Sequence, residues 1–184
     1  MREGEIDVEM REEALRQARE AFAEGRDEIF FAIEVIYEIL EYAKKEGLLA
    51  LSKDEFFRKE KEPYILDAIE EKGKKVPLKE YLAYGIDRVS FGVEFELLNV
   101  VMENRYYANA YSGKNAFISY IYLVGVIAIA RGLAFEMILA YYRSFIPDEE
   151  EEAFDKFASR WESKVDKKKI RESGRVVQFD KDKQ

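Results

Sequence analysis

Apolar residues recur at three- and four-residue steps along most of this chain, a spacing that predicts amphipathic helices. The broadest apolar stripe lies between Asp27 and Glu46 and comprises Ile29, Phe30, Ile33, Ile36, Tyr37, Leu40 and Ala43. A polar amphipathic helix is expected before it, over residues 1–26, with an interruption or bend at Gly25. Strict alternation is rare, and the only candidate strand is the short run Val176–Phe179. The pattern therefore predicts an all-α fold.

Glycine and proline divide the remaining pattern into further helices. Gly47 is expected to end one helix in the left-handed conformation that glycine permits, and Gly92 is expected to separate two more. Pro63 and Pro77 each open a helix, because proline is well tolerated in the first helical turn. No internal repeat is apparent along the chain.

The longest apolar segment spans residues 115–146 and is predicted to form the core helix. Its part Phe117–Ala130 carries no charged residue, but a membrane span needs about 20 apolar residues. Arg131 and Glu136 interrupt the continuation, and each would cost about 2–3 kcal/mol inside a bilayer. We therefore favour a buried helix of a soluble bundle, with both charged side chains near its edge or paired, over a membrane-spanning or membrane-dipping helix.

Small residues and charge patterning complete the predicted architecture. Gly125 and Gly132 would let the core helix approach its neighbours closely. A polar helix is predicted over 148–172, because its acidic start and basic end both suit the helix macrodipole. Together these features predict a single multi-helix bundle of about six to eight helices around a long apolar central helix. This domain spans residues 1–174 and is followed by a flexible tail at 175–184.

Composition limits the chemistry that this chain can perform. Of its 184 residues, 48% are hydrophobic and 37% are charged, which is enough to bury a core and remain soluble. The net charge of −8 argues against a nucleic-acid binder, because phosphate contacts need a surplus of lysine and arginine. The sequence has no cysteine and no histidine, which excludes disulfides, thiolate catalysis, a Ser-His-Asp triad and the Glu-x-x-His di-iron motif.

Motifs for cofactors are also lacking. Gly73-Lys74 and Gly113-Lys114 each lack the first glycine and the final serine or threonine of a P-loop. No EF-hand loop is present, and the acidic pairs are expected to be solvated rather than to bind metal. We therefore predict a protein that is not an enzyme and holds no cofactor or metal. The charged N-terminus has no apolar signal-peptide region, which predicts a cytoplasmic location.

Two glycine-containing segments follow each other within residues 27–111. The first reads Ala43-Lys44-Lys45-Glu46-Gly47-Leu48-Leu49-Ala50-Leu51-Ser52, and the second contains Gly85, Val89, Gly92, Glu96, Leu97, Glu103 and Asn104. Their order, their separation and the short proline-led helix between them resemble the cytoplasmic domain of MotA, the flagellar stator protein of the MotA/TolQ/ExbB superfamily. The resemblance implies a helical interaction module that contacts a component of the flagellar motor.

The resemblance also implies contact residues, with one departure. In that family a basic and an acidic residue flank the first segment and contact the rotor protein FliG; they correspond to Lys44 and Ser52. Because Ser52 is not acidic, the neighbouring Lys45, Lys53 and Asp54 complete the candidate partner-binding set with Lys44. The two pairs of membrane helices of the family have no counterpart in this sequence, so proton conduction is not expected.

Two alternatives to a protein-interaction module remain open. A bundle that binds an apolar small molecule would use the tyrosines that crowd the apolar helix, which are Tyr106, Tyr107, Tyr111, Tyr120, Tyr122, Tyr141 and Tyr142. A peripheral membrane-associated subunit would instead anchor through residues 117–142. A homo-oligomer is compatible with each of these hypotheses. Structural roles are expected for Gly47, Gly85, Gly92, Arg131 and Glu136.

Overall fold

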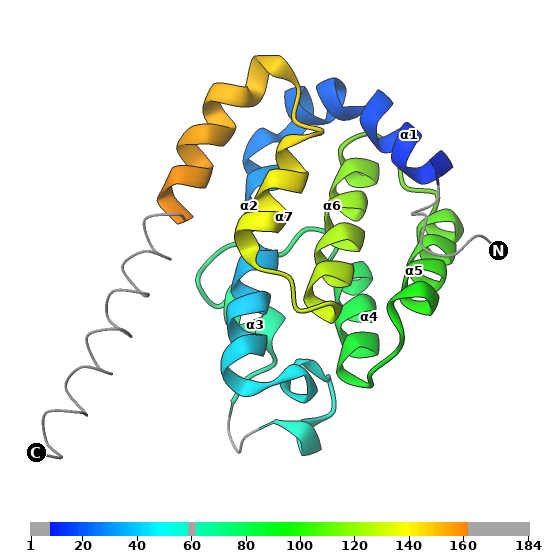
Figure 1. Ribbon diagram of the computed structural model, residues 1–184, viewed down its shortest axis with the longest axis vertical. Coiled ribbons are helices and arrows are strands. Elements are labelled where there is room, and N and C mark those ends of the chain that lie inside the picture. Colours follow the sequence, from blue (N-terminus) through cyan, green and yellow to red (C-terminus); the bar gives the residue numbers. More distant parts are fainter. Residues whose placement is uncertain (1–7, 59–61, 162–184) are drawn as a thin grey trace, which may run out of the picture. The chain divides into compact units, whose positions relative to one another are not determined.

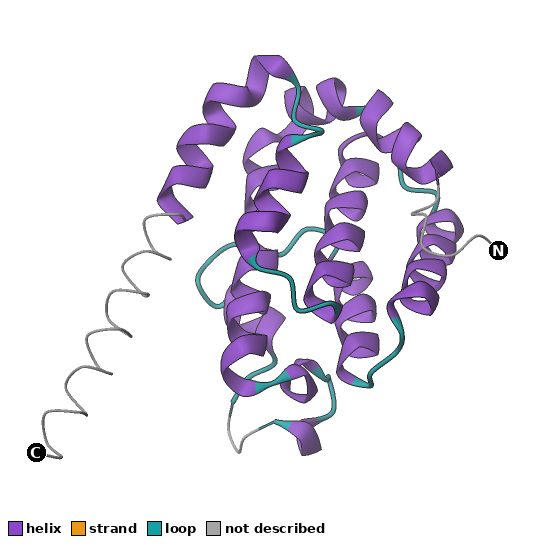
Figure 2. Ribbon diagram, viewed as in Figure 1, coloured by secondary structure: helices purple, strands orange, loops and turns teal. Residues whose placement is uncertain are grey.

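A computed structural model describes residues 8–58 and 62–161 of the protein (Figure 1). Every regular element in this part of the chain is a helix, and the described residues contain no strand (Figure 2). The predicted all-α fold is therefore confirmed, whereas the candidate strand Val176–Phe179 and the tail at 175–184 lie outside the described residues. The elements are α1 (Val8–Arg16), α2 (Ala18–Glu46), η1 (Leu48–Leu51), η2 (Glu55–Phe57), α3 (Ile65–Glu70), α4 (Lys79–Ser90), α5 (Phe95–Asn109), α6 (Gly113–Ala130), α7 (Phe135–Arg143) and η3 (Asp148–Glu150).

The chain forms two compact units, Met1–Pro147 and Asp148–Gln184. The first unit contains α1 to α7 together with the short 3₁₀ helices η1 and η2. The second begins with η3 and continues as a helix over residues 151–161, which is the described part of the polar helix predicted over 148–172. The division coincides with the start of that polar helix, and a single domain over residues 1–174 stays a prediction.

The first unit is built around α6. All residues from Ala116 to Val126 are buried, and so are Ala128 and Ile129, so the helix has no continuous polar face. The helices α1, α2, α4, α5 and α7 all pack against it, and its most extensive contact is with α2. A helix that is apolar on all sides needs neighbours on all sides. The predicted bundle around one long apolar helix is therefore confirmed.

The single core helix predicted over residues 115–146 is wrong, because this segment forms α6, a turn and then α7. Gly132 turns the chain with a φ of +65°. Its N–H donates to the Ile129 carbonyl at 3.0 Å, and the Leu133 N–H donates to the Ala128 carbonyl at 2.9 Å. These are the two hydrogen bonds of a Schellman motif, which ends a helix where glycine accepts a left-handed conformation.

The α4–α5 turn has the same construction, although no repeat was expected from the sequence. Gly92 has a φ of +70°, and its N–H donates to the Val89 carbonyl at 3.0 Å. The Val93 N–H donates to the Arg88 carbonyl at 3.2 Å, which completes a second Schellman motif. Two consecutive helical hairpins, α4–α5 and α6–α7, therefore share one turn geometry.

The two hairpins also share residues. The shared residues, separated by a constant offset along the chain, are Gly85, Gly92, Phe95 and Glu96 in the first hairpin and Gly125, Gly132, Phe135 and Glu136 in the second. The expectation that the chain has no internal repeat is therefore corrected for this region. The four pairs of identical residues are present in the sequence, but so few matches between two apolar helical segments are easily overlooked.

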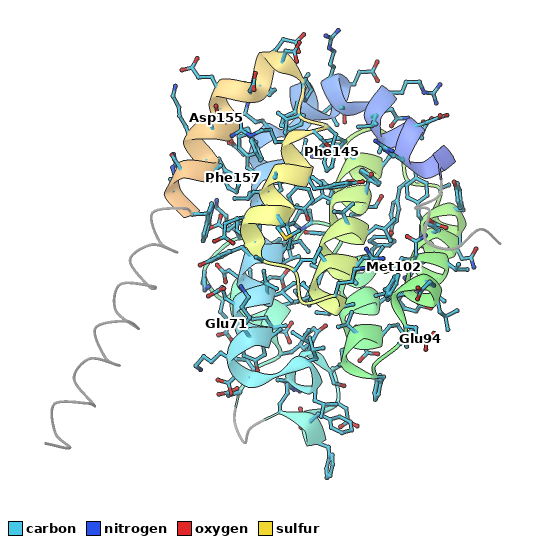
Figure 3. The ribbon with its side chains drawn as sticks, in the orientation of Figure 1. Glu71, Glu94, Met102, Phe145, Asp155 and Phe157 are labelled. Carbon is cyan, nitrogen blue, oxygen red and sulfur yellow. The ribbon has the colours of Figure 1, made fainter. Side chains whose placement is uncertain are left out.

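Gly85 and Gly125 lie where helices approach one another closely. A Cβ atom at Gly125 would come within 2.6 Å of two carbons of Ile36 on α2. A Cβ atom at Gly85 would come 2.7 Å from the sulfur of Met102, which projects from α5 (Figure 3). The predicted close approach at Gly125 is confirmed, whereas a Cβ atom at Gly132 would meet nothing within 4 Å, so this glycine serves the turn instead.

Two further glycines shape α2. Gly25 has a non-helical φ of −168° and ψ of 55°, so the predicted bend at this position is confirmed. Gly47 follows directly after the helix end, as predicted, and its φ of +89° favours glycine. Its ψ of 162° lies outside the left-handed helical region, so the left-handed conformation predicted for this residue is wrong.

One described helix, α6, is long and apolar enough to cross a membrane. However, 72% of its apolar window is buried inside the protein, and the core helix of a soluble protein passes the same test of length and composition. The predicted membrane anchor over residues 117–142 is also not one continuous helix, because Arg131 and Gly132 form a turn within it. The structure therefore gives only weak evidence for membrane association.

Candidate interaction surface

Three helices of the first unit end near one another, and a glycine follows each end. Arg131, after α6, stacks on the Phe95 ring at the start of α5, with 3.9 Å from its guanidinium carbon to the ring centroid. Phe57 of η2 contacts Phe91 after α4, with 6.0 Å between ring centroids. We call this region, which comprises residues 44–58, 87–97 and 130–137, the glycine end; it occupies the lower half of the view in Figure 1.

The glycine end exposes more large apolar side chains than the rest of the described chain. Phe56 is 85% exposed, and five others are also largely in contact with solvent, namely Leu48, Leu49, Phe91, Leu97 and Met137. Only Leu15, Tyr107 and Tyr141 are exposed large apolar residues elsewhere in the described residues. Isolated exposed apolar residues are normal, but a cluster of them marks a contact surface.

Two small grooves flank the end of α6 within this region. One, of about 340 Å³, lies between the ends of α2 and α6, where Ala43, Leu48 and Ile129 line it. The other, of about 220 Å³, lies between α6 and α7, and its lining includes Ile127 and Met137. Arg131 also lines each groove. The apolar surface is therefore concave on both sides of one exposed cation.

The predicted partner-binding lysines are at the glycine end and are exposed. Lys44 forms an ion pair with Glu41 at 3.2 Å, Lys45 pairs with Glu46, and Lys53 pairs with Glu80. Ion pairs between exposed side chains contribute only about 0–1 kcal/mol. Breaking these ion pairs in order to bind another protein would therefore cost little free energy. The positive charges of Lys44 and Lys45 also suit the negative end of the α2 dipole.

The other two residues near the first glycine have local structural roles. The Asp54 carboxylate accepts a hydrogen bond from the Phe56 N–H at 2.9 Å, which caps η2. Ser52 is fully buried; its hydroxyl donates to Asp87 and accepts from the Asp54 N–H at 3.1 Å. The position that the resemblance assigns to an acidic contact residue is thus internal in this chain.

The residues that were expected to be structural have identifiable roles. Gly92 forms a Schellman turn, and Gly85 permits the close packing of α4 on α5. Arg131 is exposed above Phe95, in agreement with its expected place at the helix edge. Glu136 lies in the exposed first turn of α7, where a negative charge suits the helix dipole.

The sequence analysis missed the exposed apolar residues Phe56, Phe91 and Met137. Their signal was weak, because Phe56 and Met137 each follow a glutamate and Phe91 lies between a serine and a glycine, in segments that read as a polar turn or helix start. Phe56 and Phe91 both contact the ring of Phe57, and this cluster exists only because η2 meets the end of α4. The repeat offers one partial signal, since Leu97 and Met137 occupy equivalent exposed positions beside Glu96 and Glu136.

The tyrosines that were proposed to bind a small molecule mostly fill the core. Tyr120, Tyr122 and Tyr142 are fully buried, and burial raises the pKa of each hydroxyl, which therefore stays neutral. The Tyr142 hydroxyl donates to the Ile121 carbonyl at 2.9 Å, and the hydroxyls of Tyr120 and Tyr141 are 3.1 Å apart. These contacts hold the rings in the packing of α6 and α7.

The fold and this surface define an all-α helical bundle with an apolar, charge-flanked end. Among the described residues, no group of three or more acidic side chains is arranged to hold a metal ion. No known protein family, curated protein or solved structure matches the chain. The function must therefore be argued from the surface itself.

Proposed function

We propose that this chain is a non-enzymatic protein-interaction module of the cytoplasm whose glycine end binds a protein partner. The observation that carries the proposal is the concentration of exposed apolar side chains at that end, exemplified by Phe56, Phe91 and Met137. Protein interfaces combine an apolar centre with a charged rim, and the exposed lysines and glutamates of the glycine end fit such a rim. The resemblance to the MotA cytoplasmic domain supports a partner in the flagellar motor.

The proposal is tested by binding of purified rotor and stator proteins from the organism that encodes this chain. Leu49→Ser and Phe91→Ser remove apolar area at the glycine end without changing charge. Each should weaken binding about tenfold, as expected when an apolar contact residue of an interface is lost. Leu15→Ser, on α1, is the matched control and should leave the affinity unchanged. Equal affinities for all three variants would contradict the proposed surface.

The charged rim has its own test. Lys44→Glu reverses the charge at the position that the resemblance assigns to rotor contact. It should slow association and weaken the dependence of the association rate on salt, because rim charges act mainly through electrostatic steering and salt then has less attraction to screen. Lys156→Glu, on an exposed lysine of the second unit, is the control for the change in net charge. A partner that binds Lys44→Glu and wild type at equal rates would not use this rim.

A groove-bound apolar small molecule is the second candidate function. It is favoured by the apolar lining of the groove between α6 and α7, which includes Val124, Ile127 and Ile138. The volume of about 220 Å³ is smaller than the roughly 300–1,000 Å³ of most small-molecule pockets. A thermal-shift screen with apolar ligands, repeated on Ile127→Ser, tests it: a ligand that stabilises both proteins equally would not occupy this groove.

A further inference from the structure

The two grooves beside the end of α6 differ in charge from the chain as a whole. Among the described residues, two charged side chains line them: Arg131 in both grooves and Lys44 in the groove between α2 and α6. No carboxylate of the described residues lines either groove, although the net charge of the chain is −8. Most of the remaining lining is apolar, as at Leu40, Ile127 and Ile138. The grooves are therefore apolar and cationic in an acidic protein.

The guanidinium group of Arg131 has donors that are accessible from the grooves. It stacks on the Phe95 ring at 3.9 Å and makes no ion pair or side-chain hydrogen bond with another described residue. Stacking uses the face of the guanidinium, whereas its N–H donors point outward in the plane of the group. The side chain is exposed, and none of its nitrogen atoms is buried without a partner. A molecule in the grooves can therefore reach these donors.

Arg131 is better suited to bind a carboxylate than the other cation of the grooves. A planar guanidinium with two accessible N–H donors binds both oxygens of a carboxylate at once. Its stacking on Phe95 also holds it in place, so less side-chain entropy is lost on binding. Lys44 is already paired with Glu41 at 3.2 Å, and its flexible ammonium group lacks the bidentate geometry.

The backbone at the end of α6 is compatible with an anion beside Arg131. The last carbonyl groups of a helix carry partial negative charge and would repel a carboxylate. Here the carbonyls of Ile127, Ala128 and Ile129 accept hydrogen bonds from the N–H groups of residues 131–133. These turn hydrogen bonds satisfy the carbonyls and reduce the repulsion.

The size of the grooves limits what else the ligand carries. Their volumes, about 340 and 220 Å³, lie near or below the lower limit of small-molecule pockets, which is roughly 300 Å³. Each groove therefore suits an apolar side chain of a larger molecule, as pockets at protein interfaces do. A carboxylate with an apolar side chain on either side would match the two grooves and the arginine that they share.

We propose that the glycine end recognises an acidic amphipathic segment of its protein partner, in which a carboxylate lies between two apolar side chains. The carboxylate forms a bidentate ion pair with Arg131, and each apolar side chain enters one groove. This inference rests on the proposed function, because it names the partner chemistry for the same surface. It assigns Arg131 to the centre of the contact, whereas the exposed lysines belong to the rim.

Selection of short random peptides on the full chain tests the proposal without knowledge of the natural partner. The enriched peptides should contain an aspartate or glutamate with apolar residues on both sides. Arg131→Gln should bind them about tenfold more weakly, because a charge-assisted pair is lost. Arg105→Gln, which removes a guanidinium stacked on Tyr84 at 4.5 Å, is the matched control and should bind as wild type does. Absence of enriched peptides, or enrichment of peptides without an acidic residue, overturns the proposal.

A double-mutant cycle shows whether the carboxylate contacts Arg131. The acidic residue of a selected peptide is replaced by the corresponding amide, and both peptides are titrated against wild type and Arg131→Gln. For a direct contact, the amide peptide should bind the two proteins with nearly equal affinity. Two full and additive losses would place the carboxylate elsewhere and overturn the proposal.

Variants of the groove walls test the apolar part of the proposal. Leu48→Ser and Met137→Ser each change the lining of one groove, and each should weaken binding of the selected peptides several-fold because apolar contact area is lost. An effect of one variant alone would show that only one groove is occupied, which overturns the proposed arrangement.

The result is separable from that of the proposed function. A rotor or stator protein whose binding is weakened by Leu49→Ser and Phe91→Ser, but not by Arg131→Gln, would support the proposed function and overturn this inference. Acidic peptides that depend on Arg131 would support this inference even if neither motor protein binds. Sedimentation of the chain alone tests a second copy as the occupant. A dimer that Arg131→Gln dissociates would assign the grooves to that second copy and overturn the inference.

Discussion

The α4–α5 and α6–α7 hairpins share their glycine positions and their turns but use the first glycine differently. Gly85 on α4 faces the flexible side chain of Met102, which belongs to its own hairpin, and also approaches Val126 of α6. Gly125 on α6 faces Ile36 of α2, which belongs to no repeat. The two hairpins therefore have the same glycine positions and turns, but their first glycines pack against different residues. The local sequence determines the turn of each hairpin, whereas the position of the hairpin in the bundle determines which side chain lies against its first glycine.

The largest expected effect is at the second hairpin. Gly125→Ala places a methyl group against three atoms of Ile36, whose β-branched side chain has few rotamers in a helix. Against so stiff a neighbour we expect overpacking to cost about 3 kcal/mol, the upper end of its usual range, and the gain in helix propensity is about 1 kcal/mol, so the net loss should be near 2 kcal/mol. Urea unfolding measures it. The loss should be smaller in an Ile36→Val background, and an equal loss there would contradict direct packing of the two residues.

The two turns should respond alike, because both are Schellman motifs with open space around the glycine. Gly92→Ala and Gly132→Ala each force a left-handed conformation on alanine, which costs about 1–2 kcal/mol. Chemical denaturation of both variants should give the same loss within error. A much smaller loss at Gly132 would show that the second turn is not the structural equivalent of the first.

The hydroxyls of the second hairpin offer a smaller test. Tyr142→Phe removes a hydroxyl that donates to the Ile121 carbonyl and should cost about 1 kcal/mol. Tyr122→Phe removes a buried hydroxyl that has no partner among the described residues, so its stability should be unchanged or higher. Thermal unfolding of both variants checks the contrast. Equal losses would mean that Tyr122 has a partner in solution, such as a buried water molecule.

The smallest effect is expected at the glycine of the first hairpin. Gly85→Ala meets the Met102 sulfur at 2.7 Å and its terminal carbon at 2.9 Å, and methionine can rotate these atoms away. The gain in helix propensity, about 1 kcal/mol, should nearly offset the remaining strain. Its unfolding free energy should lie within about 0.5 kcal/mol of wild type. A loss as large as that of Gly125→Ala would remove the proposed difference between the hairpins.

Most of the fold could be predicted from periodicity and from helix-breaking residues. Five of the seven residues of the predicted apolar stripe of α2 are buried, Phe30 and Tyr37 being half-buried, and the bend at Gly25 was expected. The main error was the continuous core helix, because the apolar character on both sides of Arg131 outweighed the stop signal of Gly132. The same signal at Gly92 was recognised, since the residues around that glycine are polar enough to read as a turn.

The candidate surface could be predicted only in part. Lys44, Lys45 and Lys53 are exposed, as charged residues beside a helix end usually are, and their role in binding a partner stays a prediction. Asp54 was assigned to a partner but caps η2, and the lack of an acceptor among the described residues for the buried hydroxyls of Tyr64 and Tyr122 was not foreseen. Burial of a tyrosine hydroxyl without an acceptor depends on every neighbouring backbone group, and no pattern in the sequence encodes it.

By itself, the sequence determined most helix starts and ends, the end of α6 at Gly132 excepted, because glycine, proline and apolar periodicity act over a few residues. It also determined which reactions are excluded, because the chain contains no thiol and no imidazole. Tertiary structure decided that the ends after α2, α4 and α6 meet, that Phe56 and Phe91 stay exposed there, and that Ser52 does not. Exposure depends on how distant segments cover one another, and that is settled only when the helices pack around α6.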